Sequence, residues 1–492
     1  MATQLHKDRL SAIDASFLHQ EKQASHMHVG ALVIFDGPPP SREEFCAHIG
    51  SRLPLVPRYR QKLATPRLEM GRPFWIDDPS FNLDYHARHT ALPKPGSEDQ
   101  LRQLVGRIFS QRLDRSKPLW EVWLVQGLEG GRFALISKTH HALVDGVSGV
   151  DIATVLFDLQ PTPAEPPASD GWTPAPEPSG VELVAEGVKG LLRTPFDLAG
   201  RAIGAAQRLG RSLEQLREAA EGVGEVVWAG MNPAPDVPLN VPIGPHRRVW
   251  WVQSRLADFK EVKNALGGTV NDAVLTVVAG ALGRWLRTRG IRTEGMELRA
   301  LVPVSIRAED EHGTLGNRIA AMRGPLPVYV DDPVERLEIV RESMGNLKQS
   351  KQALGAEVIA GLQDFAPPTL LAQASRVNFS TRLFNLIVTN VPGPQFPLYM
   401  LGREMEEIVP IAFLPENHAL AIAIMSYNGK LDFGLLGDYD AMPDLEQFGT
   451  YLDESLEELL AVARRESAAA AGSNGRKKGA GPGNARRKTP AS

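Results

Sequence analysis

The chain has 492 residues, enough for two or three domains with a large apolar core that needs no disulfides. Hydrophobic residues make up 43% and charged residues 23%, which is the composition of a globular protein. The net charge of -4 provides no field for nucleic acid, and the single cysteine, Cys46, excludes a disulfide framework or a Cys-rich zinc module. The start lacks the apolar core of a signal peptide and no apolar run reaches 18 residues, so we expect a cytoplasmic protein.

The first half of the chain combines strand, helix and linker signals. Met27–Phe35 and Arg132–Thr139 are rich in β-branched and aromatic residues, which predicts strands. Gly146–Leu159 carries apolar residues near helical spacing, which predicts a helix. Pro161–Gly180 holds seven prolines, and because proline removes backbone donors the segment predicts an exposed linker. Helical spacing returns over residues 183–220, with arginines interspersed.

A second folded region is predicted from His246 onward. Its expected elements are strands 247–254, 297–304 and 385–390, a helix over 269–287, helical segments between 332 and 383, a hairpin of 420–427 with 430–436, and a closing helix over 443–466. The hairpin is signalled by Asn428-Gly429, because a type I′ turn needs positive φ at both central residues. Strands and helices mix without regular βαβ alternation, so we expect an α/β fold of layered α+β type.

These shifts divide the chain into four parts. Residues 1–160 form an N-terminal subdomain, 161–245 a Pro-rich linker with a helical connector, and 246–466 a C-terminal subdomain. Residues 468–492 contain six basic and no acidic residues and little that could be buried, so the part from 467 to 492 is expected to be a disordered basic tail.

The densest polar cluster runs from Lys138 to Gly146, where a predicted strand ends and a helix begins. Adjacent residues in an extended segment point to opposite sides, so only one of His140 and His141 can face a given cavity. A histidine with a pKa near neutrality can take a proton from an alcohol and return it to a leaving thiolate. An ordinary loop with two histidines and Asp145 as a helix cap remains an equal alternative.

Other chemistries find less support in the residues. His26 with His28 and His86 with His89 add further histidine pairs, but no HExxH or thiolate cluster accompanies them, so no metal site is expected. The ordinary interpretation places the first pair on one strand face and the second in a solvated loop. No G-x-S-x-G elbow exists for serine catalysis and no P-loop for an ATP-driven ligase.

The residues HHALVDG at 140–146 match the HHxxxDG motif of the bacterial wax ester synthase/diacylglycerol acyltransferase family. Chloramphenicol acetyltransferase, the carnitine acyltransferases and peptide-synthetase condensation domains share that motif. Further blocks resemble this family in the same order: LSAIDASFL (10–18), SHMHVG (25–30), PLWE (118–121), VNDAVL (270–275), VPVSIR (302–307) and NLIVTNVPGP (385–394). The resemblance runs from about residue 8 to 466.

This resemblance implies two chloramphenicol-acetyltransferase-like subdomains with the active site in a channel between them. It implies that His141 is the general base, which deprotonates an acceptor hydroxyl so that the oxygen attacks the thioester of a fatty acyl-CoA. His140 would shape the site. No covalent intermediate, bound cofactor or metal is implied, and acyl-CoA is a co-substrate.

The resemblance also implies roles for supporting residues. Asp145 would be structural and pair with an arginine, for which Arg307 is a candidate by its place in VPVSIR. Gly146 suits a close approach of the chain after Asp145. Asn271 and Asp272 match a second motif of the family, although Asn and Asp also favour helix N-termini.

The acceptor implied first is diacylglycerol, which gives triacylglycerol; a long-chain fatty alcohol, which gives a wax ester, is the alternative. A non-catalytic lipid-binding member of the fold is a second alternative. Because such substrates reside in lipid, peripheral contact with a membrane or lipid droplet is expected, through 183–220 or the basic tail. For residues 183–220 an ordinary helix packed between the subdomains is the favoured alternative, because acidic residues dilute its positive charge. For the tail, a solvated segment is just as plausible.

Overall fold

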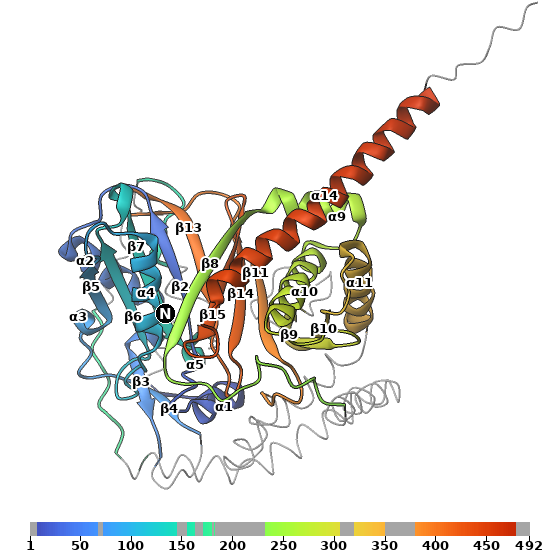
Figure 1. The fold of residues 1–492 in the computed structure, drawn as a ribbon. Helices are drawn as coiled ribbons and strands as arrows, with labels where there is room; N and C mark the ends of the chain where they lie inside the picture. Colours follow the sequence, from blue (N-terminus) through green and yellow to red (C-terminus); the bar gives the residue numbers. More distant parts are fainter. Residues whose placement is uncertain are drawn as a thin grey trace, which may run out of the picture.

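The computed structural model describes residues 7–66, 72–144, 155–162, 171–179, 182, 232–305, 319–349 and 379–478. Two six-stranded sheets stand side by side and helices cover them, with α14 running across the front (Figure 1). Two clusters of buried apolar side chains form the core, one mainly around each sheet. The predicted α/β fold of layered sheets and helices is confirmed.

The first sheet has the strand order β12-β13-β2-β7-β6-β5. Its strands are β2 (His28–Phe35), β5 (Ala87–Ala91), β6 (Trp120–Gln126), β7 (Phe133–His140), β12 (Tyr399–Met400) and β13 (Arg403–Ile411). The strands predicted at 27–35 and 132–139 agree with β2 and β7 to within one residue. β2 and β7 pair antiparallel with His28 opposite His140, so the histidine motif begins at the end of a central strand.

Among the described residues, five helices that the structure bounds at both ends, three short 3-10 turns and a small sheet complete this half. They are α1 (Ala12–Gln20), α2 (Arg42–Arg52), α3 (Leu83–His86), α4 (Glu98–Phe109) and α5 (His141–Val144), the turns η1 (Leu53–Leu55), η2 (Pro57–Arg60) and η4 (Glu129–Gly131), and the sheet β1-β4-β3 of β1 (Lys7–Arg9), β3 (Gln61–Ala64) and β4 (Phe74–Asp77). Ser11, Ser41 and Ser97 cap α1, α2 and α4 by accepting backbone hydrogen bonds. Such caps satisfy donors that a helix start leaves open.

The second sheet has the order β10-β9-β11-β14-β15-β8. Its strands are β8 (Arg247–Arg255), β9 (Glu297–Ser305), β10 (Ile319–Pro327), β11 (Leu386–Pro392), β14 (Leu420–Tyr427) and β15 (Lys430–Asp438), and its helices are α9 (Leu256–Leu266), α10 (Val270–Thr288), α11 (Pro333–Gln349) and α14 (Leu445–Lys478). Asn428 and Gly429 have φ of 44° and 83°, as the predicted type I′ hairpin requires. The other predicted strands of this half agree to within two residues.

The second half of the chain contributes β12 and β13 to the first sheet. β13 comes from the second half of the sequence, yet it pairs antiparallel with β2 in the first sheet (Figure 1). It also packs on β15, where a Cβ on Gly434 would lie only 1.8 Å from the backbone oxygen of Pro410. A single cut in the sequence therefore does not separate the two sheets, and the predicted domain bounds stay a prediction.

The closing helix is longer than predicted. α14 continues through Lys478, so a disordered tail from residue 468 is the wrong prediction for residues 468–478. Packing nucleates the helix in its first part, where Leu445, Phe448 and Leu452 are buried. The run of alanines from Ala468 then propagates it, because alanine has the highest helix propensity. In Figure 1 this end of α14 projects away from the body of the protein.

Several predicted segments lie outside the described residues: most of 146–159, all of 183–220, 350–378 and 479–492. In the linker, residues 171–179 contain no helix or strand, as its prolines predict. Trp172 nevertheless packs against Phe81 and under the guanidinium of Arg60.

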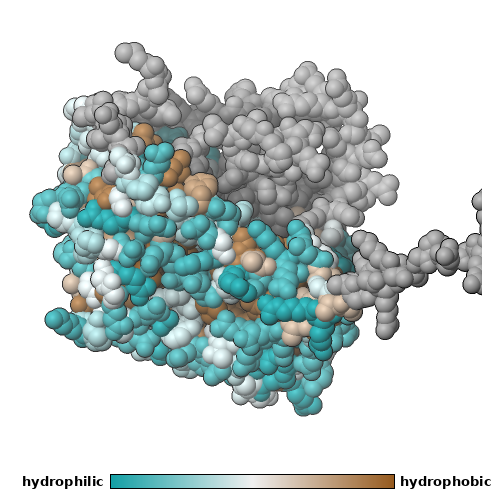
Figure 2. Space-filling view, turned by 90° about the horizontal axis from the view of Figure 1, so that it is seen from above, coloured by the Kyte–Doolittle hydropathy of each residue, from teal (hydrophilic) through white to brown (hydrophobic). Residues whose placement is uncertain are grey.

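Most of the face shown in Figure 2 is hydrophilic, and hydrophobic side chains gather there in a few small patches. Within the described residues, no helix taken singly has the length and apolar composition to cross a membrane, whereas α9 and α10 together, bent by 101°, meet that criterion. The predicted cytoplasmic location stays a prediction.

Candidate active site

The histidine motif lies where β7 passes into α5, and its backbone is held from both sides. The N–H of His140 donates to the oxygen of Leu119 at 3.0 Å, and the N–H of His141 donates to the oxygen of Met27 at 2.9 Å. Leu119 and the adjacent Trp120 are fully buried, so the PLW block packs the core beside the catalytic strand. The backbone at this turn is therefore fixed by its neighbours in the sheet.

His140 is buried, with 1% of its surface exposed. Its Nδ1 accepts a hydrogen bond from the N–H of Ala142 at 3.1 Å, so in the neutral ring the proton is on Nε2, which faces Glu21 Oε2 at 3.7 Å. Burial, together with the charge of Arg115, lowers the pKa of His140 to about 3. His140 is therefore a neutral residue that shapes the turn.

His141 is half-buried and lies between two aromatic rings. Its ring stacks on Phe17 of α1, with centroids 3.9 Å apart, and meets Phe413 edge-on at 5.4 Å. Phe17 belongs to the first half of the chain, whereas Phe413 follows β13 from the second half. The imidazole therefore lies where the two halves meet.

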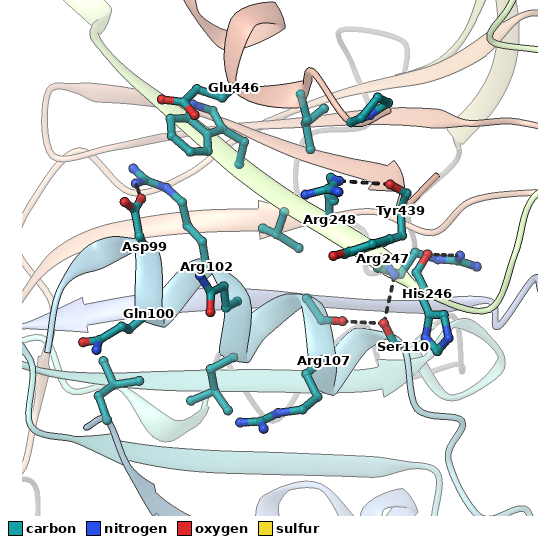
Figure 3. A pocket seen from close by; sticks show the side chains of 18 of the residues that line it. Asp99, Gln100, Arg102, Arg107, Ser110, His246, Arg247, Arg248, Tyr439 and Glu446 are labelled. Carbon is teal, nitrogen blue, oxygen red and sulfur yellow. Dashed lines mark hydrogen bonds and ion pairs between the residues drawn. The ribbon is translucent and has the colours of Figure 1, made fainter. Parts of the chain in front are cut away.

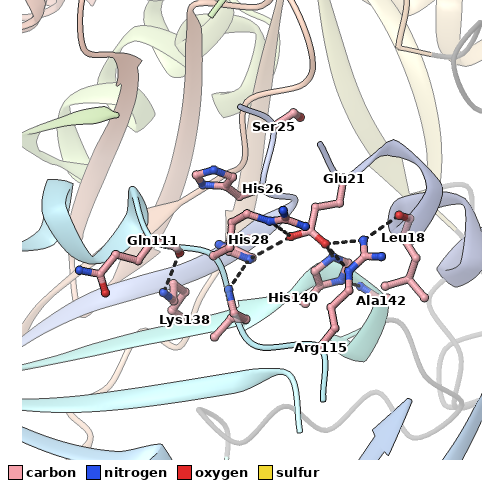
Figure 4. A network of polar contacts seen from close by, with 12 residues as sticks. Leu18, Glu21, Ser25, His26, His28, Gln111, Arg115, Lys138, His140 and Ala142 are labelled. Atoms are coloured by element: carbon pink, nitrogen blue, oxygen red, sulfur yellow. Dashed lines mark hydrogen bonds and ion pairs between the residues drawn. The ribbon is translucent and has the colours of Figure 1, made fainter. Parts of the chain in front are cut away.

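A buried carboxylate, Glu21, stands behind the motif (Figure 4). Its side chain is 1% exposed and contacts Arg112 and Arg115, as well as the rings of His28 and His140. Sequence reasoning missed this residue. Its only signal was its position between the blocks LSAIDASFL and SHMHVG.

Lys138 is also buried, two residues before the motif. Its Nζ donates to the oxygens of Ile108 and Gln111 at 3.0 Å each, and it lies 3.7 Å from Glu121. Burial lowers the pKa of Lys138 to about 8. The side chain ties the end of α4 to the catalytic strand.

The remaining predicted residues divide into two groups. Asp145, Gly146 and Arg307 lie outside the described residues. Asp272 forms a capping box with Thr269 at the start of α10, which is the helix-terminus alternative. Asn271 accepts a hydrogen bond from Asn390 at 3.2 Å and lines a cavity of about 500 Å³.

Side chains of α4 and β8, among others, line a cleft of about 980 Å³ (Figure 3). Its charges are largely engaged with neighbours: Arg102 pairs with Asp99 at 2.8 Å, and the guanidinium of Arg248 lies 4.0 Å from the ring centre of Tyr439. At its inner end the buried Arg247 binds the oxygen of Ala24. The cleft walls thereby join the two halves.

His26 and His28 are buried beside Glu21, whereas the second predicted pair separates. His86 is fully buried and stacks on Trp120 at 4.7 Å, so a solvated loop was the wrong interpretation for it. His89 is exposed on β5. Among the side chains that the structure describes, no three His, Cys, Asp or Glu groups are arranged to hold a metal ion.

Two family models match the chain. The model for the wax ester synthase/diacylglycerol acyltransferase catalytic domain matches residues 10–274, and that for the WS/DGAT C-terminal domain matches residues 315–460. Together they cover both halves, which confirms the resemblance inferred from the sequence blocks.

Similar proteins span nearly the whole chain. A probable diacylglycerol O-acyltransferase of Mycobacterium tuberculosis, tgs1, is 30% identical over 465 residues, with 93% of this chain and 97% of that protein covered. A second one from the same organism, tgs2, is 34% identical over 458 residues, with 92% and 98% covered.

Solved structures agree in fold. The wax ester synthase/diacylglycerol acyltransferase from Marinobacter aquaeolei VT8 matches with a TM-score of 0.64 and 28% identity, over 92% of this chain and 99% of that one. The starter condensation domain of rhizomide synthetase RzmA matches with a TM-score of 0.55 and 13% identity, over 93% and 95%, which is a likeness of fold alone.

Proposed function

The chain belongs to the wax ester synthase/diacylglycerol acyltransferase family, and we propose that His141 of this acyltransferase is the general base that forms triacylglycerol from diacylglycerol and a long-chain acyl-CoA. The observation that carries this role is the position of His141. Its half-buried ring lies between Phe17 and Phe413, one from each half of the fold, in the motif that the family shares.

The reaction needs one proton acceptor and no covalent enzyme intermediate. Neutral His141 takes the proton of the diacylglycerol hydroxyl while the oxygen attacks the thioester carbonyl. The C–S bond then breaks, and the imidazolium returns its proton to the sulfur of CoA. The rings of Phe17 and Phe413 support this role, because they hold the imidazole in place where the two halves of the fold meet.

Diacylglycerol is a lipid of the bilayer, so we propose that the protein meets its acceptor at a membrane or lipid-droplet surface. The same chemistry would serve a fatty alcohol, which would give a wax ester. The acceptor should therefore be offered in vesicles or mixed micelles, as dioleoylglycerol in one arm and as hexadecanol in the other.

The test measures release of free CoA from palmitoyl-CoA by the purified full-length chain, with the lipid products separated by chromatography. We expect triacylglycerol to form, and His141→Ala to lower turnover by about 10²–10⁴-fold with little change in melting temperature. His89→Ala, a histidine exposed on β5, is the matched control and should be fully active. Full activity in His141→Ala would refute the assigned base, and absence of CoA release with either acceptor would favour a lipid-binding protein without catalysis.

A further inference from the structure

Glu21 places a full negative charge in the interior directly behind the catalytic turn. A carboxylate with a 1% exposed side chain is costly unless it is paired. Oε1 contacts Arg112 Nε at 3.3 Å, and Oε2 contacts Arg115 Nε at 2.6 Å (Figure 4). The ring nitrogens Nε2 of His140 and His28 lie 3.7 and 3.9 Å from the carboxylate. Two guanidinium groups therefore neutralise Glu21, and two imidazoles surround it.

One consequence reaches His141 through α1. The backbone N–H of Glu21 donates to the oxygen of Phe17 at 3.0 Å, and Arg115, held by Glu21, donates to the oxygen of Leu18 at 2.8 Å. Both contacts lie at the last turn of α1, where Phe17 stacks on the ring of His141, but only the second depends on the side chain of Glu21. Through Arg115 the carboxylate thereby holds the helix turn that carries Phe17.

A second consequence reaches His141 through His140. The carboxylate of Glu21 favours a proton on Nε2 of His140, which leaves Nδ1 free to accept the N–H of Ala142. That hydrogen bond spans the turn on which His141 lies. A change in the orientation of the His140 ring would therefore move His141, which lies between His140 and Ala142 in the chain.

The third consequence is electrostatic. Among the described residues, the other charged or titratable groups around the cluster include Lys138 on β7 with its partner Glu121, His26 and His28 at the start of β2, and Arg112 and Arg115 after α4. Burial lowers the pKa of His26 and His28, and Glu121 lies 3.7 Å from Lys138, so the positive charges that Glu21 balances are those of Arg112 and Arg115. Positive charge disfavours a protonated imidazole, and Glu21 contacts both guanidinium groups.

We propose that Glu21 is a positioning residue of the acyltransferase: through Arg115, Leu18 and His140 it holds the ring of His141 against Phe17, and its charge offsets the arginines beside the site. This role rests on the proposed general-base function of His141. Glu21 touches no substrate, and nothing in the motif blocks assigns it a role.

The first variant is Glu21→Gln, which keeps the shape of the side chain and removes its charge. We expect kcat to fall on the order of 10-fold or more while both KM values stay nearly unchanged, because geometry and not substrate binding is affected. The acidic limb of the kcat profile should shift by about half a pH unit to lower pH, since Arg112 and Arg115 then disfavour the imidazolium. Glu21→Asp, which keeps the charge, should restore the position of that limb.

A matched control variant, and a variant expected to shift the kcat profile in the opposite direction, complete the test. Asp444 before α14 is likewise a carboxylate held by an arginine, since its Oδ1 lies 2.6 Å from Arg289, and Asp444→Asn should leave the kcat profile in place. Arg115→Gln leaves the negative charge of Glu21 less compensated, so it should shift the acidic limb to higher pH. Opposite shifts in Glu21→Gln and Arg115→Gln are the signature of the proposal, and either variant tests it if the other fails to fold.

A readout without turnover separates this proposal from the proposed function. Diethyl pyrocarbonate acylates neutral imidazole, so the pH dependence of its reaction with His141, followed by peptide mass spectrometry, reports the titration of that ring. Opposite shifts in a protein that releases no CoA would support the positioning role and refute the acyltransferase reaction. Unshifted curves in folded variants with a lowered melting temperature would reduce Glu21 to a structural residue and overturn the proposal.

Discussion

Two adjacent histidines have different surroundings, and each surrounding decides what its ring can do. His140 is enclosed between β7 and Glu21, and burial keeps it neutral with a pKa of about 3. His141 is half-buried between two phenylalanines at the junction of the halves. A ring with a strongly lowered pKa is a poor proton acceptor near neutral pH, and this difference supports the proposal that His141 is the general base and that His140 has a structural role.

His140→Ala should therefore act mainly through stability. The substitution leaves a cavity and removes the acceptor of the Ala142 N–H, which together cost about 2–4 kcal/mol in the free energy of unfolding. His140→Asn is the matched variant, because its side-chain oxygen can take over from Nδ1, and it should lose less. Urea unfolding at pH 7.5 measures both. A His140→Ala protein of unchanged stability and no activity would show that His140 takes part in the chemistry.

The sequence locates the catalytic turn but not what surrounds it. HHALVDG is a local pattern, so its position at a strand end followed from neighbouring residues alone. Phe413 and Glu21 are brought to the turn by tertiary packing, and such contacts leave no local periodicity to detect. His86 was misinterpreted for the same reason, because its burial depends on the distant Trp120.

At the scale of elements, local sequence patterns predicted the strands of the hairpin and of the motif region, but they did not predict one long-range strand pairing. The content of β-branched and aromatic residues predicted β2 and β7, and the Asn428-Gly429 hairpin signal predicted β14 and β15, all to within two residues. The pairing of β13 with β2 joins segments at opposite ends of the chain, and nothing in either strand specifies its partner. The extent of α14 was underestimated because a low content of apolar residues was taken as disorder, although alanine needs no burial to remain helical.

The close packing of β13 on β15 predicts that substitution of one glycine is destabilising. Gly434 on β15 lets the backbone of Pro410 approach, and a methyl group there would meet that oxygen at 1.8 Å. Gly434→Ala should lower the free energy of unfolding by about 2–3 kcal/mol, and it should also lower kcat, because Phe413 follows β13 directly. The control is Gly345→Ala in α11, where a Cβ meets nothing within 4 Å; it should raise stability by about 0.5–1 kcal/mol. Equal effects of both substitutions in urea unfolding would contradict the close approach of the sheets.

At the scale of the whole molecule, buried titratable groups of opposite kind act on stability together. Burial lowers the pKa of His86 and His418 to about 4. At acidic pH these rings take up protons more readily in the unfolded chain, which lowers the free energy of unfolding. Burial raises the pKa of Glu407 on β13 and Asp432 on β15 to about 7, and the charge of Glu407 adds to the effect on Asp432. As pH rises from about 4 to about 7, the histidines increase stability and the two acids decrease it. The two trends oppose each other, so these four groups together should change stability little over this range.

Asp432→Asn removes one of the two acids whose ionisation lowers stability as the pH rises. The folded pKa of Asp432, about 7, lies above the unfolded value of about 4, so the wild-type carboxyl costs nothing below pH 4 and its full penalty appears above pH 7. The variant should match wild type near pH 4.5 and exceed it by about 2 kcal/mol at pH 8, since the amide carries no charge into the space between the sheets. Glu457→Gln, on the exposed face of α14, is the control and should change stability little at either pH. Urea unfolding of the three proteins at both pH values measures the difference. A stability gain that is equal at pH 4.5 and pH 8 would show that ionisation of Asp432 does not lower the free energy of unfolding.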